Sequence, residues 1–116
     1  RDDTPGCTTE ATDFTQAVTD FAAANTIVLG VSKDSVKKHE KFVAKHALGI
    51  ALLSDEDNDV CERYGTWVEK SMYGNTYMGI ERSTFLIGSD GKIAQIWRKV
   101  KVAGHVDAVL AAAQRT

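Results

Sequence analysis

Two cysteines, Cys7 and Cys61, are the residues of this 116-residue chain best suited to covalent chemistry. Cys7 follows a Thr4-Pro5-Gly6 turn and stands where the apolar periodicity of a helix begins. The N-terminal amides of a helix and the positive end of its dipole stabilise a thiolate, which is the reactive form of cysteine. The position of Cys7 therefore favours a nucleophilic or redox role over that of a small buried residue at a helix end.

The apolar pattern predicts the elements that place Cys7. Apolar side chains recur every three or four residues over 8–25, which predicts a helix ending near residue 25. Residues 26–32 form a continuous β-branched and apolar run, which is typical of a central strand buried on both faces of a parallel sheet. A second helix is expected from residue 34 or 35 to about residue 48, with Gly49 ending it.

The second half of the chain alternates short apolar runs with turn signals. Residues 67–81 show no clear period, and we expect a loop there. An Asp-Gly pair at 90–91 separates two strand-like runs, which predicts an antiparallel hairpin. The remaining expected elements are a strand at 50–53, a short helix at 57–64, hairpin strands at 82–87 and 92–101, and a last helix at 105–114. This order predicts an α/β fold of the thioredoxin type, with a mixed sheet flanked by helices.

Composition narrows the range of functions. The chain is 43% hydrophobic and carries 14 Lys and Arg against 16 Asp and Glu, which argues against a disordered segment and against a nucleic-acid or anionic-membrane partner. No apolar run approaches the ~20 residues that span a bilayer, and the first residues do not resemble a signal peptide. Two cysteines make no disulfide framework, so we expect a reducing, cytoplasmic location.

Metal sites find little support in the sequence. The histidines have no metal-ligand spacing with either cysteine, and we expect them at exposed helix positions; they are His39, His46 and His105. The acidic alternation at 55–59 resembles a calcium loop, but Val60 stands where that loop requires glycine. We therefore expect no metal site.

The Thr4-Pro5-Gly6-Cys7 loop resembles the active-site loop of the peroxiredoxin Q group, the bacterioferritin comigratory proteins, including Asp2 and Asp3 ahead of it. The resemblance continues in family order through Val-Leu-Gly-Val-Ser-Lys-Asp-Ser at 28–35, Leu-Leu-Ser-Asp-Glu-Asp at 52–57, Tyr-Gly at 64–65 with Trp67, Arg-Ser-Thr-Phe-Leu-Ile at 82–87 and Asp-Gly-Lys-Ile at 90–93. It implies a thiol peroxidase of thioredoxin fold that reduces hydrogen peroxide and organic hydroperoxides and needs no metal, flavin or haem.

Peroxide chemistry assigns roles to the matched residues. Cleavage of an O–O bond needs an attacking thiolate, hydrogen-bond donors that hold the two oxygens, and positive charge for the leaving oxygen. By resemblance, Cys7 is the nucleophile that becomes a sulfenic acid, Thr4 positions the peroxide, and Arg82 lowers the pKa of the thiol and stabilises the leaving oxygen. The backbone amides of Gly6 and Cys7 are further donors.

Two of these positions also have plainer interpretations. Without the resemblance, Arg82 would be read as a surface arginine paired with Glu81 or another acid. Glu10 would serve the dipole of the first helix, whereas by resemblance it also orients Arg82.

The chain departs from the family pattern at Thr12, where many relatives carry a second cysteine that resolves the sulfenic acid. Two routes remain: Cys61 resolves Cys7, or an external thiol such as thioredoxin, glutaredoxin or glutathione reduces Cys7 directly. Cys61 falls in the expected short helix, where a buried structural cysteine is the usual explanation. We expect the external route, a one-cysteine cycle, and a monomer rather than a dimer.

Two other functions are compatible with the same residues. The chain could be a non-catalytic thioredoxin-fold redox sensor or interaction module that signals through oxidation of Cys7. It could also be a plain α/β scaffold in which Cys7 is inert.

The domain is expected to extend beyond the printed sequence. Members of the resembled family place a β-hairpin and a central strand ahead of the active-site loop. We therefore expect residues 1–116 to belong to a single thioredoxin-like domain, with roughly 35 to 40 residues of an ordinary ~150-residue domain ahead of Arg1.

Overall fold

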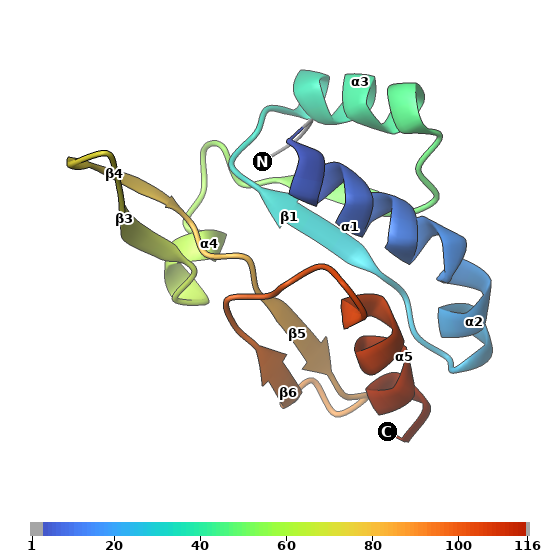
Figure 1. Cartoon of the computed structure of the whole chain (residues 1–116). Coiled ribbons are helices and arrows are strands. Elements are labelled where there is room, and N and C mark those ends of the chain that lie inside the picture. The colour runs from blue at the N-terminus through green and yellow to red at the C-terminus, as the bar shows by residue number, and fades with distance from the viewer. Residues whose placement is uncertain (1–3, 116) are drawn as a thin grey trace.

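Helices and strands alternate along the chain in the computed structural model, which describes residues 4–115 (Figure 1). The helices are α1 Pro5–Gln16, α2 Val18–Ala23, α3 Val36–His46, α4 Val60–Arg63 and α5 His105–Arg115. The strands are β1 Leu29–Ser32, β2 Ala51–Ser54, β3 Trp67–Met72, β4 Asn75–Ile80, β5 Thr84–Ile87 and β6 Ile93–Trp97. Asp2 and Asp3 of the matched loop lie outside the described residues.

The strands pair in both senses, as the sequence predicts. β1 and β2 are parallel, with Gly30 opposite Leu52, whereas β3–β4 and β5–β6 are antiparallel hairpins. The hairpin of β5 and β6 confirms the Asp-Gly turn, because Gly91 takes the positive φ of 80° that glycine adopts without strain. The architecture is therefore α/β with a mixed strand arrangement.

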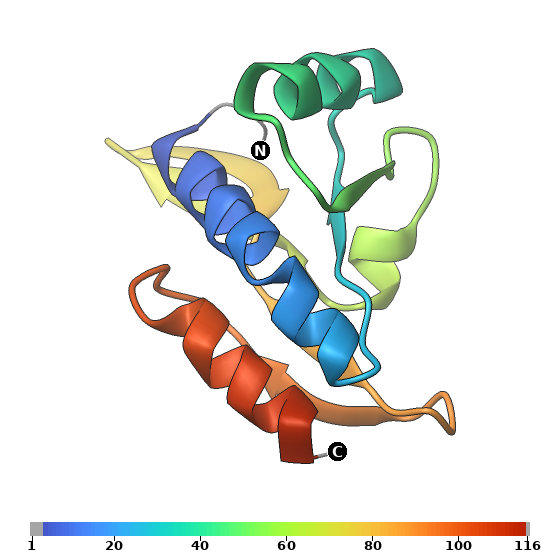
Figure 2. The same ribbon diagram turned by 90° about the vertical axis from the view of Figure 1, so that its right-hand side faces the viewer.

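The core lies where the first and last helices meet. α1 and α2 run end to end beside α5 (Figure 2). Their buried side chains include Phe14, Phe21 and Val109, and the rings of Phe14 and Phe21 are 5.8 Å apart between centroids. Since Phe14 lies on the helix that begins at Cys7, burial of this face fixes the orientation of α1.

One helix was expected over residues 8–25, and the structure divides it in two. The break falls at Ala17, whose amide is shared between the carbonyls of Asp13 at 3.2 Å and Phe14 at 3.1 Å. Threonine hydroxyls bonded back to the preceding turn accompany the break; Thr15 Oγ1, for example, donates to the carbonyl of Ala11 at 2.8 Å. α2 then ends before Asn25, which takes a positive φ of 58°.

The expected loop over 67–81 is wrong, because these residues form the hairpin of β3 and β4. Tyr73 and Gly74 occupy its two-residue turn with φ of 51° and 80°, the backbone of a type I′ turn. The hairpin projects away from the helices (Figure 1), and residues 71–78 are exposed on both faces. Because neither face of residues 71–78 is buried, their sequence lacks the alternation of apolar and polar residues that predicts a strand.

The expectation that 26–32 is buried on both faces is also wrong. β1 covers only Leu29–Ser32, and the side chains of Ile27, Leu29 and Val31 are exposed. In the described part of the chain β1 pairs with β2 alone, and nothing there covers those side chains.

α3 begins as predicted but ends early. The Ser35 hydroxyl accepts a hydrogen bond from the Lys38 amide at 3.1 Å, which is an N-cap. The helix ends at Ala47, which adopts the left-handed conformation, and not at Gly49.

Two of the three histidines contradict the expectation of exposed positions. His39 is buried between α3 and β2, where Nε2 lies 3.2 Å from the Leu53 carbonyl oxygen. His105 is buried at the start of α5. The Nε2 atoms of both His39 and His105 have hydrogen-bond partners, as the burial of polar side chains requires.

Candidate active site

The first turn of α1 carries Cys7 and its nearest hydrogen-bond partner. Thr4 is the N-cap, and its carbonyl accepts the Thr8 amide at 2.9 Å, but its side chain makes no capping bond to the helix. The Thr4 side chain instead hydrogen-bonds the Cys7 thiol. Pro5 at the first helical position supplies a preset φ where an N–H would find no helical acceptor. Thr4 is therefore oriented toward the sulfur rather than toward the helix amides.

Arg82 reaches the same sulfur from the other half of the chain. It precedes β5, and its carbonyl accepts the Val100 amide at 2.9 Å, which anchors the backbone at this point. Arg82 Nη2 lies 3.4 Å from Cys7 Sγ, and Nη1 forms an ion pair with Glu10 Oε2. One guanidinium group thus contacts two side chains of α1, one turn apart.

The plainer interpretation paired Arg82 with Glu81 or another acid at the surface; the acid is Glu10 of α1, and Arg82 is partly buried. Glu81 lies 3.8 Å from Arg98 instead. The Arg82 side chain is 29% exposed and Glu10 is 18% exposed, so their ion pair is largely shielded from solvent.

Gly6 lies next to the Arg82 guanidinium. A Cβ atom at position 6 would stand 2.8 Å from Arg82 Nη2, closer than side chains tolerate. Helix geometry also leaves the first-turn amides of Gly6 and Cys7 without an intrahelical acceptor, so these donors are directed out of the N-terminus. The absence of a side chain at Gly6 therefore lets the cation approach this end of α1.

The electrostatics of the site favour a thiolate at Cys7. Burial acts to raise the pKa of the Cys7 thiol, whereas, among the described residues, the Thr4 hydrogen bond and the Arg82 charge act to lower it, and the net shift is downward. Burial acts to lower the pKa of Arg82, but Glu10 and Cys7 raise it, so the guanidinium stays charged. A half-buried thiolate beside a fixed cation and hydrogen-bond donors is an arrangement suited to attack on a polar, cleavable bond.

Cys61 has the opposite environment. It is buried in α4, and its amide donates to Asp55 Oδ2 at 2.8 Å. Burial and the neighbouring Asp55 carboxylate raise the pKa of the Cys61 thiol to about 11. Neither cysteine takes part in a disulfide within the described residues, and of the two only Cys7 has surroundings that stabilise a thiolate.

A hydrogen-bonded pair that the sequence did not single out joins the buried His105 to Thr84, close in sequence to Arg82. His105 Nε2 is 2.7 Å from Thr84 Oγ1, two residues after Arg82. Burial lowers the pKa of His105, Glu10 acts to raise it and Arg82 acts to lower it. The position of Thr84 in the Arg-Ser-Thr-Phe run was the available signal, but nothing in the spacing links it to residue 105.

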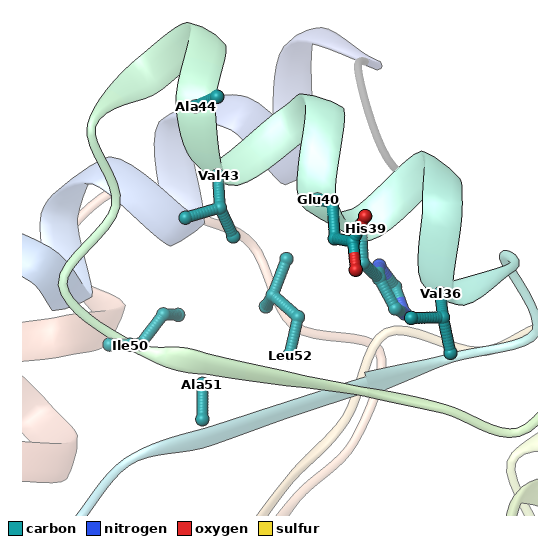
Figure 3. Close-up of a pocket in the computed structure, with 8 residues that line it drawn as sticks. All are labelled: Val36, His39, Glu40, Val43, Ala44, Ile50, Ala51 and Leu52. Carbon is teal, nitrogen blue, oxygen red and sulfur yellow. The ribbon is translucent and has the colours of Figure 1, made fainter.

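A surface groove between α3 and β2 lies away from Cys7. It has a volume of about 460 Å³ between α3 and β2, and the side chains of Val36, Val43 and Leu52 point into it (Figure 3). None of Thr4, Cys7 or Arg82 lines this groove. Among residues 4–115 there is no cluster of histidine, cysteine, aspartate or glutamate suited to a metal ion, and no helix there has the length and apolar character needed to cross a membrane.

The chain is similar to known proteins along most of its length. Residues 1–96 match the family model described as the AhpC/TSA family. The chain is 53% identical over 112 residues to peroxiredoxin Bcp of Xanthomonas campestris, covering 97% of this chain and 70% of the relative. It is 49% identical over 106 residues to peroxiredoxin Bcp of Bacillus subtilis, covering 91% of this chain and 68% of the relative.

The fold has equally similar solved counterparts. A structure of the Xanthomonas campestris bacterioferritin comigratory protein, studied for its alkyl peroxide reduction activity, superposes with a TM-score of 0.93 at 50% identity, covering 99% of this chain and 73% of that one. This likeness confirms the thioredoxin-like α/β fold.

Proposed function

The chain belongs to the AhpC/TSA family and is a thiol peroxidase of its peroxiredoxin Bcp group, and from this premise we propose that Cys7 is the residue that attacks the peroxide. The observation that carries the proposal is the contact of Arg82 Nη2 with Cys7 Sγ at 3.4 Å. A cation at this distance stabilises the thiolate, which is the nucleophile that peroxide cleavage requires.

The proposed reaction uses the Cys7 thiolate, a set of hydrogen-bond donors and one oriented cation. The Cys7 thiolate attacks one peroxide oxygen, an S–O bond forms, and the O–O bond breaks. The other oxygen leaves as hydroxide or alkoxide and takes up a proton to give water or an alcohol, while Cys7 becomes a sulfenic acid. Thr4 and the amides of Gly6 and Cys7 hold the peroxide oxygens, and Arg82, oriented by Glu10, stabilises the charge on the leaving oxygen.

The substrates in this proposal are hydrogen peroxide and organic hydroperoxides. Cys7 is half-buried in the first turn of α1, so its side chain is not enclosed in the core. The alkyl peroxide reduction activity of the Xanthomonas campestris relative supports the organic class.

We assign regeneration of Cys7 to an external thiol. A first thiol condenses with the sulfenic acid to give a mixed disulfide and water, and a second thiol releases reduced Cys7 and a disulfide product. The raised pKa of Cys61 keeps it protonated near neutral pH, which makes it a poor attacking group. Thioredoxin, glutaredoxin and glutathione are the donors to test.

The test is intact-mass analysis after one equivalent of peroxide, with Cys7→Ser and Cys61→Ser as matched variants. We expect one added oxygen on wild type and on Cys61→Ser, and none on Cys7→Ser. An oxygen that still appears on Cys7→Ser would overturn the assignment of Cys7. Multiple turnovers with an added thiol donor are expected of the peroxidase, whereas a single oxidation that no donor reverses would identify a redox sensor.

A further inference from the structure

A buried histidine links the two halves of the site without touching the sulfur. His105 is the first residue of α5 and is 6% exposed. Its Nε2 lies 2.7 Å from Thr84 Oγ1, the side chain at the start of β5. This short, part-buried hydrogen bond holds its partners firmly, because breaking it would leave a polar atom of the buried His105 ring unsatisfied.

The imidazole ring also packs between aromatic rings from two other elements. The Phe14 ring lies 6.1 Å away with an edge-on interplanar angle of 80°, and the Trp97 ring lies 5.9 Å away at 83°. Edge-to-face geometry at these distances is favourable for aromatic pairs. His105 therefore contacts α1 through Phe14, β6 through Trp97 and β5 through Thr84.

Both partners are close in sequence to the groups proposed to react. Phe14 is two helical turns after Cys7, so it lies on the same face of α1. Thr84 is two residues after Arg82, whose backbone is fixed by the Val100 amide at 2.9 Å. Any shift of α1 against β5 that loosened the His105 contacts would also move Cys7 relative to Arg82.

We propose that His105 is a positioning residue for the peroxidase: it holds the strand that follows Arg82 against the helix that begins at Cys7, and so keeps the guanidinium on the sulfur. This inference rests on the proposed function of Cys7 and Arg82. It concerns the distance between two elements and not a contact of His105 with the peroxide.

The charges around His105 agree with a neutral ring. Burial is the largest influence and lowers the pKa of His105, with Glu10 on α1 acting against it and Arg82 acting with it. A neutral imidazole does not compete with Arg82 for the Glu10 carboxylate. Protonation would place a second cation near that carboxylate and weaken the hold on Arg82.

The test uses paired variants at both ends of the hydrogen bond. Thr84→Val and His105→Leu remove it, whereas Thr84→Ser and His105→Gln keep polar atoms in reach. The readouts are the pKa of Cys7, from the pH dependence of its alkylation by iodoacetamide, and the second-order rate with hydrogen peroxide. We expect the removing variants to raise the pKa of Cys7 and slow the peroxide reaction about tenfold, and Thr84→Ser to keep near-wild-type values.

The double variant and a core control separate positioning from simple stability. His105→Leu with Thr84→Val should react no more slowly than either single variant, because both remove one interaction. Phe42→Leu, at a site on α3 that is 2% exposed, should lower stability but leave the pKa of Cys7 unchanged. If Thr84→Val and His105→Leu lower stability but leave the pKa of Cys7 unchanged, as expected for Phe42→Leu, the positioning role is overturned.

These readouts also separate this inference from the proposed function. Alkylation reports on the Cys7 thiolate whether or not peroxide reacts there. A wild type that resists peroxide would refute the peroxidatic role of Cys7, while an unmoved Cys7 pKa in Thr84→Val would refute the positioning role. Should His105→Leu fail to fold, the Thr84→Val and Thr84→Ser pair decides the question.

Discussion

Glu10 and Arg82, 72 residues apart in the sequence, form an ion pair that fixes the plane of the guanidinium beside Cys7. A guanidinium has a rigid fork of donors, so a partner on Nη1 determines where Nη2 points. Glu10 thus acts on the sulfur through Arg82. Its charge and its hold on Arg82 shift the pKa of Cys7 in opposite directions.

Glu10→Gln tests which component dominates. Removing a negative charge would by itself lower the pKa of Cys7, whereas loosening Arg82 would raise it. We expect the second effect to prevail, with a higher Cys7 pKa and a peroxide rate reduced by about tenfold. Titration of Cys7 by alkylation gives the sign directly. Glu81→Gln is the matched control, because Glu81 contacts Arg98, and it should behave as wild type.

Gly6→Ala should separate activity from stability. The new Cβ would lie 2.8 Å from Arg82 Nη2, so the guanidinium must shift relative to Cys7. Alanine is favoured over glycine within helices by about 1 kcal/mol, so the helix itself should not suffer. We expect a peroxide rate about tenfold lower with an unchanged or higher urea midpoint.

Thr9→Ala is the control for the Gly6 variant. Thr9 is exposed in the same turn of α1, and its hydroxyl bonds only to the Pro5 carbonyl among the contacts of the described residues. Its replacement should leave the peroxide rate at the wild-type value. A Gly6→Ala variant as active as Thr9→Ala would show that Arg82 can act from a different position.

How far the sequence predicts this molecule depends on what each residue contacts. The helix at 105–114 and the hairpin around Gly91 were predictable, because one apolar face or one turn pair determines each. The hairpin of β3 and β4 was not, since residues 71–78 are exposed on both faces and no alternation is imposed on their sequence. The signal that remained was the two-residue Tyr73-Gly74 turn.

The candidate site shows the same division. Cys7 could be selected from its place after a Thr-Pro-Gly turn, since a helix N-terminus is a local feature. Its contact with Arg82 joins residues 75 positions apart, and only the family resemblance pointed to it. His105 was placed on an exposed helix face, because a single histidine in an amphipathic segment does not reveal the hydroxyl of Thr84 that receives it.

The lowered pKa of Cys7 should make the fold more stable as the pH rises. The unfolded thiol titrates at about 8.5 and the folded thiol below that, so between these two values the unfolded chain binds more protons. The stabilisation that the Cys7 thiolate contributes is fully present above the pKa of the thiol in the unfolded chain. It is lost as the pH falls through the pKa of the thiol in the folded chain. We expect wild type to gain stability over Cys7→Ser, measured by urea unfolding, as the pH rises from the lowered pKa of the folded thiol to about 8.5. A constant difference across this range would mean that the pKa of Cys7 is not shifted.

Cys61 should remain unreactive under conditions that modify Cys7. Its thiol is buried, and its pKa is raised to about 11 by that burial and by Asp55, so at pH 7 it is protonated and inaccessible. We expect iodoacetamide to label Cys7 alone in the native protein and both cysteines in urea. Peroxide-treated protein should then show no link between the two cysteines on non-reducing peptide mapping, and Cys61→Ser should turn over with an external thiol at the wild-type rate. A Cys7–Cys61 disulfide whose loss in Cys61→Ser stops turnover would make Cys61 the resolving cysteine. The Cα atoms of the two residues would then have to come within ~7 Å of each other, by local unfolding or through a partner subunit.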